Sequence, residues 1–136
     1  MILPDEAATI AFGKQLALQL TPPVTLELIG DVGAGKTTLV QGIAQAFGIT
    51  EQVTSPSFVI NKKYHGADNK TLSHYDFYRL PDPGLMSEEL SESINDPSTI
   101  TIIEWSDTVA DVLPADRKII KLRYLDNGTR ELEIIQ

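Results

Sequence analysis

The feature that most constrains this fold is a glycine-rich stretch, LIGDVGAGKTTLVQG, which runs from Leu28 to Gly42. Gly30, Gly35, Lys36 and Thr37 match the spacing G-x-x-x-x-G-K-[ST], which is the pattern of a phosphate-binding loop. Glycines let successive backbone N–H groups converge on phosphate oxygens, where a Cβ would collide. Because this loop lies between a strand and a helix, the pattern predicts an α/β fold.

The segments on both sides of the loop have the expected patterns. Val24–Ile29 is short, contains β-branched residues and is bounded by turn residues, which predicts a strand. Lys36–Phe47 is predicted to be a helix that ends at Gly48, since glycine tolerates the positive φ that follows a helix. Before the strand, Asp5 is a predicted N-cap for an amphipathic helix over Glu6–Leu20.

The rest of the chain predicts further strands and helices of the same domain. Expected elements are a hairpin of Ser57–Tyr64 with Lys70–Tyr78, a helix over Leu85–Ile94, a buried strand over Ile100–Glu104, and a short helix through Leu113 capped by Ser106. Asn127-Gly128 predicts a final hairpin, because both residues accept positive φ. Residues 1–136 are therefore predicted to form one P-loop NTPase-like domain, with a mostly parallel central sheet, flanking helices and antiparallel hairpin additions.

The loop chemistry predicts a nucleoside triphosphate with Mg²⁺ as ligand. Lys36 would reach the β- and γ-phosphates, and the Thr37 hydroxyl would ligate the metal. Residues 61–64 do not complete the guanine-binding pattern N-K-x-D, which favours ATP over GTP.

Hydrolysis also needs a carboxylate near the metal, usually at the end of a neighbouring buried strand. Glu104 ends the run ITIIE and is the first candidate, and Asp76 in HYDFYR is the second. Each also fits a plain role as the first solvated residue after its strand. His74 alternates onto the face of Asp76 and also fits a structural hydrogen bond. Arg79 could contact phosphate or pair with an acid.

Composition limits the function classes. The chain has 11 basic and 19 acidic residues, a net charge of −8, which argues against a protein that binds nucleic acid tightly by itself. It has no cysteine, which excludes disulfides, thiol catalysis and zinc–thiolate sites. The sequence shows neither a membrane-length apolar run nor a secretory pattern, so a cytoplasmic protein is predicted.

The acidic residues are concentrated between Leu80 and Asp116. This segment has nine acidic residues and no lysine or arginine. It fits either a solvated acidic face, the common meaning of a charge run, or a docking face for a basic partner.

Four motifs in order resemble one known family. They are GDVGAGKTT, TSPSF over Thr54–Phe58, HYDFYR over His74–Arg79, and IIEW, which ends at Trp105. Together with the opening LPDEAAT, they are similar to the bacterial TsaE (YjeE) family of tRNA threonylcarbamoyladenosine biosynthesis ATPases over nearly the whole chain. The chain departs from the family pattern at Ser106, where other members often carry Pro or Ala.

The resemblance implies an ATPase that does not perform the transfer chemistry itself. Family members associate with TsaD and TsaB, and their use of ATP supports repeated transfer of a threonylcarbamoyl group to tRNA. The acceptor is the adenosine beside the anticodon of tRNAs that read codons beginning with adenine. A small-molecule kinase and a nucleotide-gated binding module with negligible turnover are the alternatives.

The resemblance also implies roles for individual residues. Gly33, Ala34, Gly35, Lys36, Thr37 and Thr38 would cradle the phosphates, and Thr37 with Glu104 would hold Mg²⁺. Lys36, Glu104 and Asp76 would be catalytic, with Asp76 acting on the metal or on water. TSPSF would respond to the γ-phosphate, Trp105 would flank the nucleotide, and Glu6 would lie near the adenine. Plainer roles are a turn for Ser55-Pro56 and core packing for Trp105.

Overall fold

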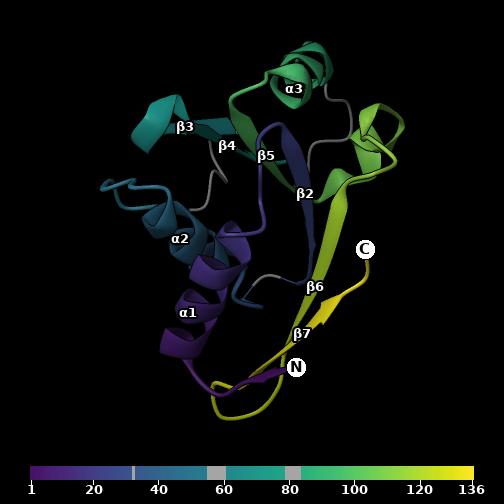
Figure 1. Cartoon of the computed structure of the whole chain (residues 1–136). Helices are drawn as coiled ribbons and strands as arrows, with labels where there is room; N and C mark the ends of the chain where they lie inside the picture. Colours follow the sequence, from purple (N-terminus) through teal and green to yellow (C-terminus); the bar gives the residue numbers. More distant parts are fainter. Residues whose placement is uncertain (32, 55–60, 79–83) are drawn as a thin grey trace.

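A mixed sheet forms the centre of the molecule (Figure 1). The computed structural model describes residues 1–31, 33–54, 61–78 and 84–136. Within these ranges, the seven strands have the order β1-β7-β6-β2-β5-β4-β3. Their bounds are β1 Ile2–Leu3, β2 Val24–Ile29, β3 Asn61–His65, β4 Thr71–Asp76, β5 Thr99–Glu104, β6 Lys118–Tyr124 and β7 Arg130–Ile134.

The middle of the sheet is parallel and its two sides are antiparallel. β2 pairs in parallel with both β5 and β6, and β4 pairs in parallel with β5. The hairpins β3–β4 and β6–β7 are antiparallel, as is the pairing of β1 with β7. The predicted parallel centre with hairpin additions is confirmed. Because β2, β4 and β5 run in one direction, their carboxyl ends meet at one edge of the sheet.

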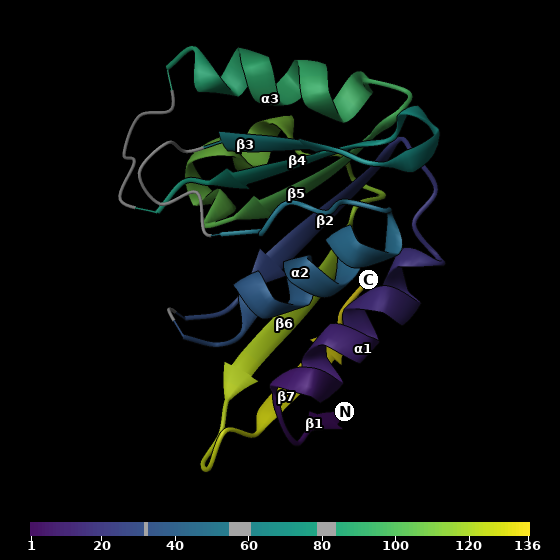
Figure 2. The ribbon, with the colours of Figure 1, turned by 90° about the vertical axis from the view of Figure 1, so that its left-hand side faces the viewer.

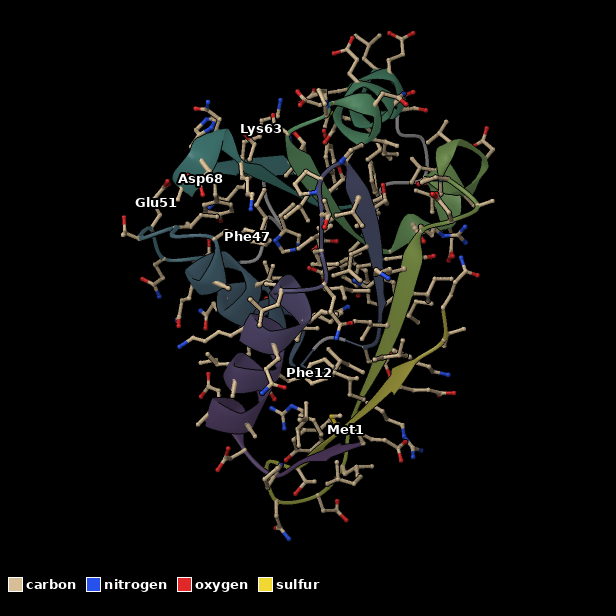
Figure 3. The ribbon with its side chains drawn as sticks, viewed as in Figure 1. Met1, Phe12, Phe47, Glu51, Lys63 and Asp68 are labelled. Atoms are coloured by element: carbon tan, nitrogen blue, oxygen red, sulfur yellow. The ribbon has the colours of Figure 1, made fainter. Side chains whose placement is uncertain are left out.

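Helices cover the sheet on both faces (Figures 1 and 2). Helices α1 (Glu6–Ala17) and α2 (Lys36–Ala46) enclose one core, in which Leu26 and Leu39 are fully buried. Phe12 points from α1 toward the sheet in this layer (Figure 3). On the other face, α3 (Met86–Asn95) and the 3₁₀ helix η2 (Ser106–Val112) enclose a second core around Tyr75 and Ile103. The short 3₁₀ helix η1 (Ala67–Asn69) lies in the β3–β4 hairpin.

Helices α1 and α2 cross at two glycines. A Cβ on Gly42 would lie 2.3 Å from the carbonyl oxygen of Ile10, and a Cβ on Gly13 would lie 2.6 Å from that of Leu39. Such distances are impossible for a real side chain, so the crossing requires glycine at both positions. The close contact sets α2, which begins at the phosphate loop, directly against α1.

Several local predictions are confirmed. The Asp5 carboxylate accepts the Ala8 N–H at 2.8 Å, as an N-cap should. Gly48 has φ +75° after α2, and Asn127 and Gly128 both have positive φ in the last hairpin. Every residue of β5 is buried, as predicted for a strand covered on both faces.

Other local predictions differ from the structure. Helix α1 ends at Ala17 rather than Leu20, because the following turn tightens and the Leu20 N–H bonds to Ala17 O. Strand β1, which pairs with β7, lies before the first predicted element and was not predicted. The Ser106 cap is wrong: Trp105 occupies the cap position of η2, and the Ser106 hydroxyl donates to Glu27 instead. Of the predicted strand Ser57–Tyr64, the part before Asn61 lies outside the described residues.

Within the described ranges, the protein has no helix with the length and apolar character needed to span a membrane.

Candidate phosphate-loop site

The glycine-rich loop connects β2 to α2, and two of its glycines stand where another residue would clash or be strained. A Cβ on Gly30 would lie 2.5 Å from Leu122 O, so this glycine lets the end of β2 pack against the backbone of β6. Gly35 has φ +97°, a left-handed conformation that favours glycine. These two glycines therefore satisfy two different requirements, a close backbone approach and a tight turn into the helix.

The first turn of α2 is open to an anion. Gly35 is the N-cap and has no side chain, and no acidic residue lies in the first turn. The N–H groups at a helix start have no intrahelical acceptors, and the helix dipole favours negative charge there. Thr37 and Thr38 are half-buried in this turn, and Ala34 is buried just before it. The arrangement suits a phosphate group.

Lys36 is buried and points across the loop. Its ammonium donates to Gly30 O and lies 3.3 Å from a carboxylate oxygen of Glu104. The same ammonium lies 4.5 Å from the centroid of the Trp105 ring, a cation–π distance. The structure thus brings three predicted site residues together, although they come from two distant parts of the sequence.

Glu104 is held by a second partner, His74. Its carboxylate accepts from His74 Nε2 at 2.5 Å, and the imidazole is completely buried. Burial by itself would raise the pKa of Glu104, but the His74 hydrogen bond and the Lys36 charge outweigh it and hold that pKa below its usual value. Glu104 is therefore an ionised carboxylate in a buried position. His74 and Asp76 are both buried, as are their neighbours on β4, so burial does not test the prediction that the two share a strand face.

Asp76 ends β4 directly beside Glu104, its register partner on β5. One Asp76 carboxylate oxygen accepts the Tyr78 N–H at 2.9 Å. Burial raises the pKa of Asp76, the Tyr78 N–H opposes this rise, and the charge of Glu104 adds to it. The two carboxylates therefore have opposite shifts, the usual sign of groups with different roles in one site.

The donor set fits a magnesium ion that is also held by phosphate. Thr37, Asp76 and Glu104 offer only oxygen donors, which Mg²⁺ prefers, and this ion commonly takes one or two protein carboxylates plus phosphate oxygens and water. No cluster of three or more histidine, cysteine or acidic side chains in the described ranges could hold a metal alone. A magnesium ion here would depend on the nucleotide for the rest of its coordination.

Trp105 lies beside the loop rather than in the hydrophobic core alone. It is half-buried, and its ring contacts that of Tyr78, with 4.7 Å between centroids. Its backbone has φ +55°, in the left-handed region. Trp105 therefore packs its ring against Lys36 and Tyr78, and its place beside a nucleotide stays a prediction.

Sequence reasoning missed Arg130, which packs against the loop from the last hairpin. A Cβ on Gly35 would lie 3.1 Å from Arg130 Nε. The guanidinium stacks on the Tyr124 ring at 4.6 Å, and its buried NH1 nitrogen has no hydrogen-bond partner among the described residues. No local pattern marks this residue, since its role depends on how β7 is placed in the sheet.

Glu6 is the first residue of α1 and is exposed. In the parts of the chain that the structure describes, no hydrogen bond or ion pair links it to the phosphate loop. Glu6 follows shortly after Leu3, the register partner of Arg130. Its predicted place near an adenine stays a prediction. Arg79 and most of TSPSF lie outside the described residues. Thr54, the first residue of that motif, accepts a hydrogen bond from Lys62 Nζ at 2.6 Å.

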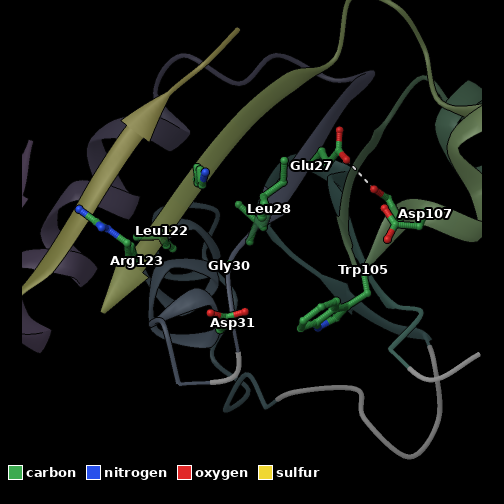
Figure 4. A pocket seen from close by; sticks show the side chains of 11 residues that line it. Glu27, Leu28, Gly30, Asp31, Trp105, Asp107, Leu122 and Arg123 are labelled. Atoms are coloured by element: carbon green, nitrogen blue, oxygen red, sulfur yellow. Dashed lines mark hydrogen bonds between the residues drawn. The ribbon is translucent and has the colours of Figure 1, made fainter. Parts of the chain in front are cut away.

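A pocket of about 290 Å³ lies next to the phosphate loop (Figure 4). Its lining includes Glu27, Gly30 and Asp31 from the β2 side and Trp105 from the opposite side. Lys36 and Thr37 do not line it. The pocket is therefore a neighbour of the candidate phosphate site and not the site itself.

A family model described as "Threonylcarbamoyl adenosine biosynthesis protein TsaE" matches residues 3–132. The chain belongs to the TsaE family. The resemblance seen in the four motifs is confirmed, and the family name places the chain in tRNA threonylcarbamoyladenosine biosynthesis.

Curated TsaE proteins are similar to this chain over most of its length. The protein named TsaE from Haemophilus influenzae is 33% identical over 98% of this chain and 86% of its own length. The Bacillus subtilis TsaE is 35% identical over 95% of this chain and 78% of its own length. The Synechocystis TsaE is 42% identical over 76% of this chain and 67% of its own length.

A solved structure agrees with the architecture. The crystal structure of Bacillus subtilis YdiB superposes with a TM-score of 0.80 at 31% identity, covering 98% of this chain and 82% of that one. The predicted P-loop NTPase-like α/β fold is confirmed.

Proposed function

We propose that this TsaE-family chain is a P-loop ATPase that binds and hydrolyses Mg-ATP to support the TsaD–TsaB complex. The product is threonylcarbamoyladenosine in tRNAs that read codons beginning with adenine. One observation carries the ATPase proposal. The Lys36 ammonium and the ionised Glu104 carboxylate lie 3.3 Å apart, beside the open first turn of α2. A fixed cation, a carboxylate and free amides at one point are the parts that phosphoryl transfer needs.

The residues of the site divide this work. The amides of the first turn, together with Lys36, would bind the phosphates and neutralise their charge. Thr37 and Glu104 would hold Mg²⁺, which supplies charge neutralisation on the phosphate oxygens when bound. His74 fixes the orientation of Glu104 through its hydrogen bond. Asp76, with its raised pKa, lies where it could position the metal or a water.

Arg130 is the second cation that we assign to the nucleotide site. Its guanidinium lies against Gly35 and has a buried N–H without a partner among the described residues. A buried donor without an acceptor is costly, and a nucleotide oxygen or ring nitrogen would satisfy it. We expect Arg130→Ala to weaken ATP binding, with Arg123→Ala, an exposed arginine on β6, as the control.

The partner proposal rests on the family and on charge. The net charge of −8 is unsuited to tight tRNA binding without help, so contact with tRNA would be made by TsaD and TsaB. A cytoplasmic location follows from this proposed place in tRNA modification.

Within the proposal, a nucleotide-gated binding module with negligible turnover is the alternative, since it would use the same loop. A small-molecule kinase would use arginines in a lid, and the sequence has none between Leu80 and Asp116, where such a lid would fall.

The test measures ATP binding and phosphate release by the chain alone and with TsaD and TsaB. We expect slow release alone and stimulation by the partners. Lys36→Ala should lower the rate by about 100-fold or more, because one transition-state charge contact is lost. Lys14→Ala, an exposed lysine on α1, is the matched control. ATP binding without release under both conditions would favour the binding module, and near wild-type release by Lys36→Ala would refute the site assignment.

A further inference from the structure

A buried carboxylate next to the phosphate loop has no role in the proposed ATPase site. Glu27 lies on β2 between Leu26 and Leu28, and only 8% of its surface is exposed. It lines the pocket of Figure 4 together with Trp105. A buried acid on the strand that leads into the loop needs a reason, because burying a charge is costly unless it is paired.

Both oxygens of Glu27 accept hydrogen bonds from other segments of the chain. One accepts the Ser106 hydroxyl at 2.5 Å, drawn as a dashed line in Figure 4. The other accepts Arg117 Nε at 2.7 Å, and Arg117 NH1 donates to Pro114 O at 3.1 Å. Glu27 therefore connects β2 to the residue after Trp105 and to the chain that enters β6.

Trp105 needs such support because its backbone is strained. It has φ +55° and ψ +55°, a conformation that bulky side chains adopt only where surrounding contacts hold it. This conformation turns the chain at the end of β5 while the ring lies 4.5 Å from the Lys36 ammonium. The hydrogen bond from the Ser106 hydroxyl to Glu27 ties the residue that follows Trp105 to β2.

We infer that Glu27 is a positioning residue that acts through Ser106 to hold Trp105 over Lys36. The inference concerns the conformation of the nucleotide-free protein, and it rests on the proposed function only where it extends to ATP affinity. It assigns the Ser106–Glu27 pair a role in shaping the nucleotide site, rather than a role in stability alone.

Trp105 is the only tryptophan in the chain, so intrinsic fluorescence reports on it directly. The test compares Ser106→Ala with Ser93→Ala. Both serines are 7% exposed; the Ser106 hydroxyl donates to the Glu27 carboxylate, and the hydroxyls of Ser93 and Thr101 share a hydrogen bond of 2.8 Å beneath α3. Each variant removes a buried hydrogen bond, to the Glu27 carboxylate next to Trp105 in one case and to the neutral Thr101 hydroxyl in the other.

We expect both variants to lower the urea midpoint, Ser106→Ala more because its lost bond has a charged acceptor, but a change in Trp105 only for Ser106→Ala. Loss of a buried hydrogen bond shifts a conformational ratio by about fivefold. The emission maximum of Ser106→Ala should therefore move to longer wavelength, and its acrylamide quenching constant should rise. Ser93→Ala should keep the wild-type values.

Glu27→Ala tests whether the two residues act as one unit. It should change Trp105 fluorescence as Ser106→Ala does, and the double variant should change it no further. Circular dichroism checks that each variant is folded. Wild-type fluorescence in folded Ser106→Ala, or an equal change in Ser93→Ala, would overturn the inference.

ATP titration separates this inference from the proposed function. If the chain binds Mg-ATP, Ser106→Ala should lower the affinity by up to about fivefold relative to Ser93→Ala, and equal affinities would remove this extension. If wild-type protein binds no ATP, the proposed function fails, while the fluorescence comparison in nucleotide-free protein still decides the role of Glu27.

Discussion

Replacing Gly42 by alanine should destabilise the protein, although the same change in an ordinary helix stabilises it. Alanine is favoured over glycine inside a helix by about 1 kcal/mol. Here the new Cβ would lie 2.3 Å from Ile10 O and 3.1 Å from the Gly13 Cα, whereas ordinary contacts begin at 3.4 Å. Helices α1 and α2 would therefore have to separate by about 1 Å, which forfeits a quarter to a half of the dispersion energy between facing atoms.

The magnitude follows from these two opposing terms. Overpacking a close contact costs about 1–3 kcal/mol, occasionally more, and the severity of the Ile10 contact places Gly42→Ala at the upper end. After the gain in helix propensity, a net loss of about 2 kcal/mol remains. For a chain of this length, that loss corresponds to a fall in Tm of roughly 6–10 °C.

Thermal and urea unfolding followed by circular dichroism would measure the effect. Gln45→Ala, an exposed position on the same helix, should change stability by no more than about 0.5 kcal/mol. The double variant Gly13→Ala/Gly42→Ala should lose less than the sum of the single losses, because one displacement of α1 relieves both clashes. A Tm for Gly42→Ala at or above that of wild type would refute this account of the crossing.

Three further predictions concern the site and the surface. Thr37→Ala and Glu104→Ala should each raise the Mg²⁺ concentration needed for half-maximal phosphate release, because each removes an oxygen donor from the metal; unchanged dependence would exclude a metal role. Asp76→Asn should slow turnover more than it weakens ATP binding. Asp76→Asn should also raise the free energy of unfolding at pH 7. The pKa of Asp76 is raised in the folded state, so the stability of the wild-type protein falls as pH rises through the carboxyl range, and the uncharged Asn avoids this loss. An Asn variant less stable than wild type at pH 7 would contradict this argument. Reversing Glu88 and Glu92 to Lys should slow association with TsaD–TsaB in a salt-dependent way if α3 is a docking face, and unchanged association would identify a solvated face. Glu89 is kept in that variant because its carboxylate accepts a hydrogen bond from Asn61.

The sequence alone determined the features that depend on neighbouring residues. The spacing of Gly35 and Lys36 predicted a phosphate loop between a strand and a helix, because the loop geometry is local. The Asp5 cap and the Asn127-Gly128 turn followed from the same kind of rule, in which a side chain or a positive φ acts within a few residues. The apolar run that ends at Glu104 identified a strand buried on both faces.

Only the tertiary structure decided which distant residues meet. Arg130 lies against Gly35 because β7 follows β6 at the far side of the sheet, and His74 reaches Glu104 because β4 and β5 are paired in parallel. Strand order and register leave no local pattern, so neither contact could be predicted. Ser106 shows the same limit from the other direction. The sequence position of Ser106 suits a helix cap. In the fold, however, the Ser106 hydroxyl donates to the buried carboxylate of Glu27, which is far away in the chain. A hydrogen bond to a charged group is stronger than a cap bond to a backbone amide.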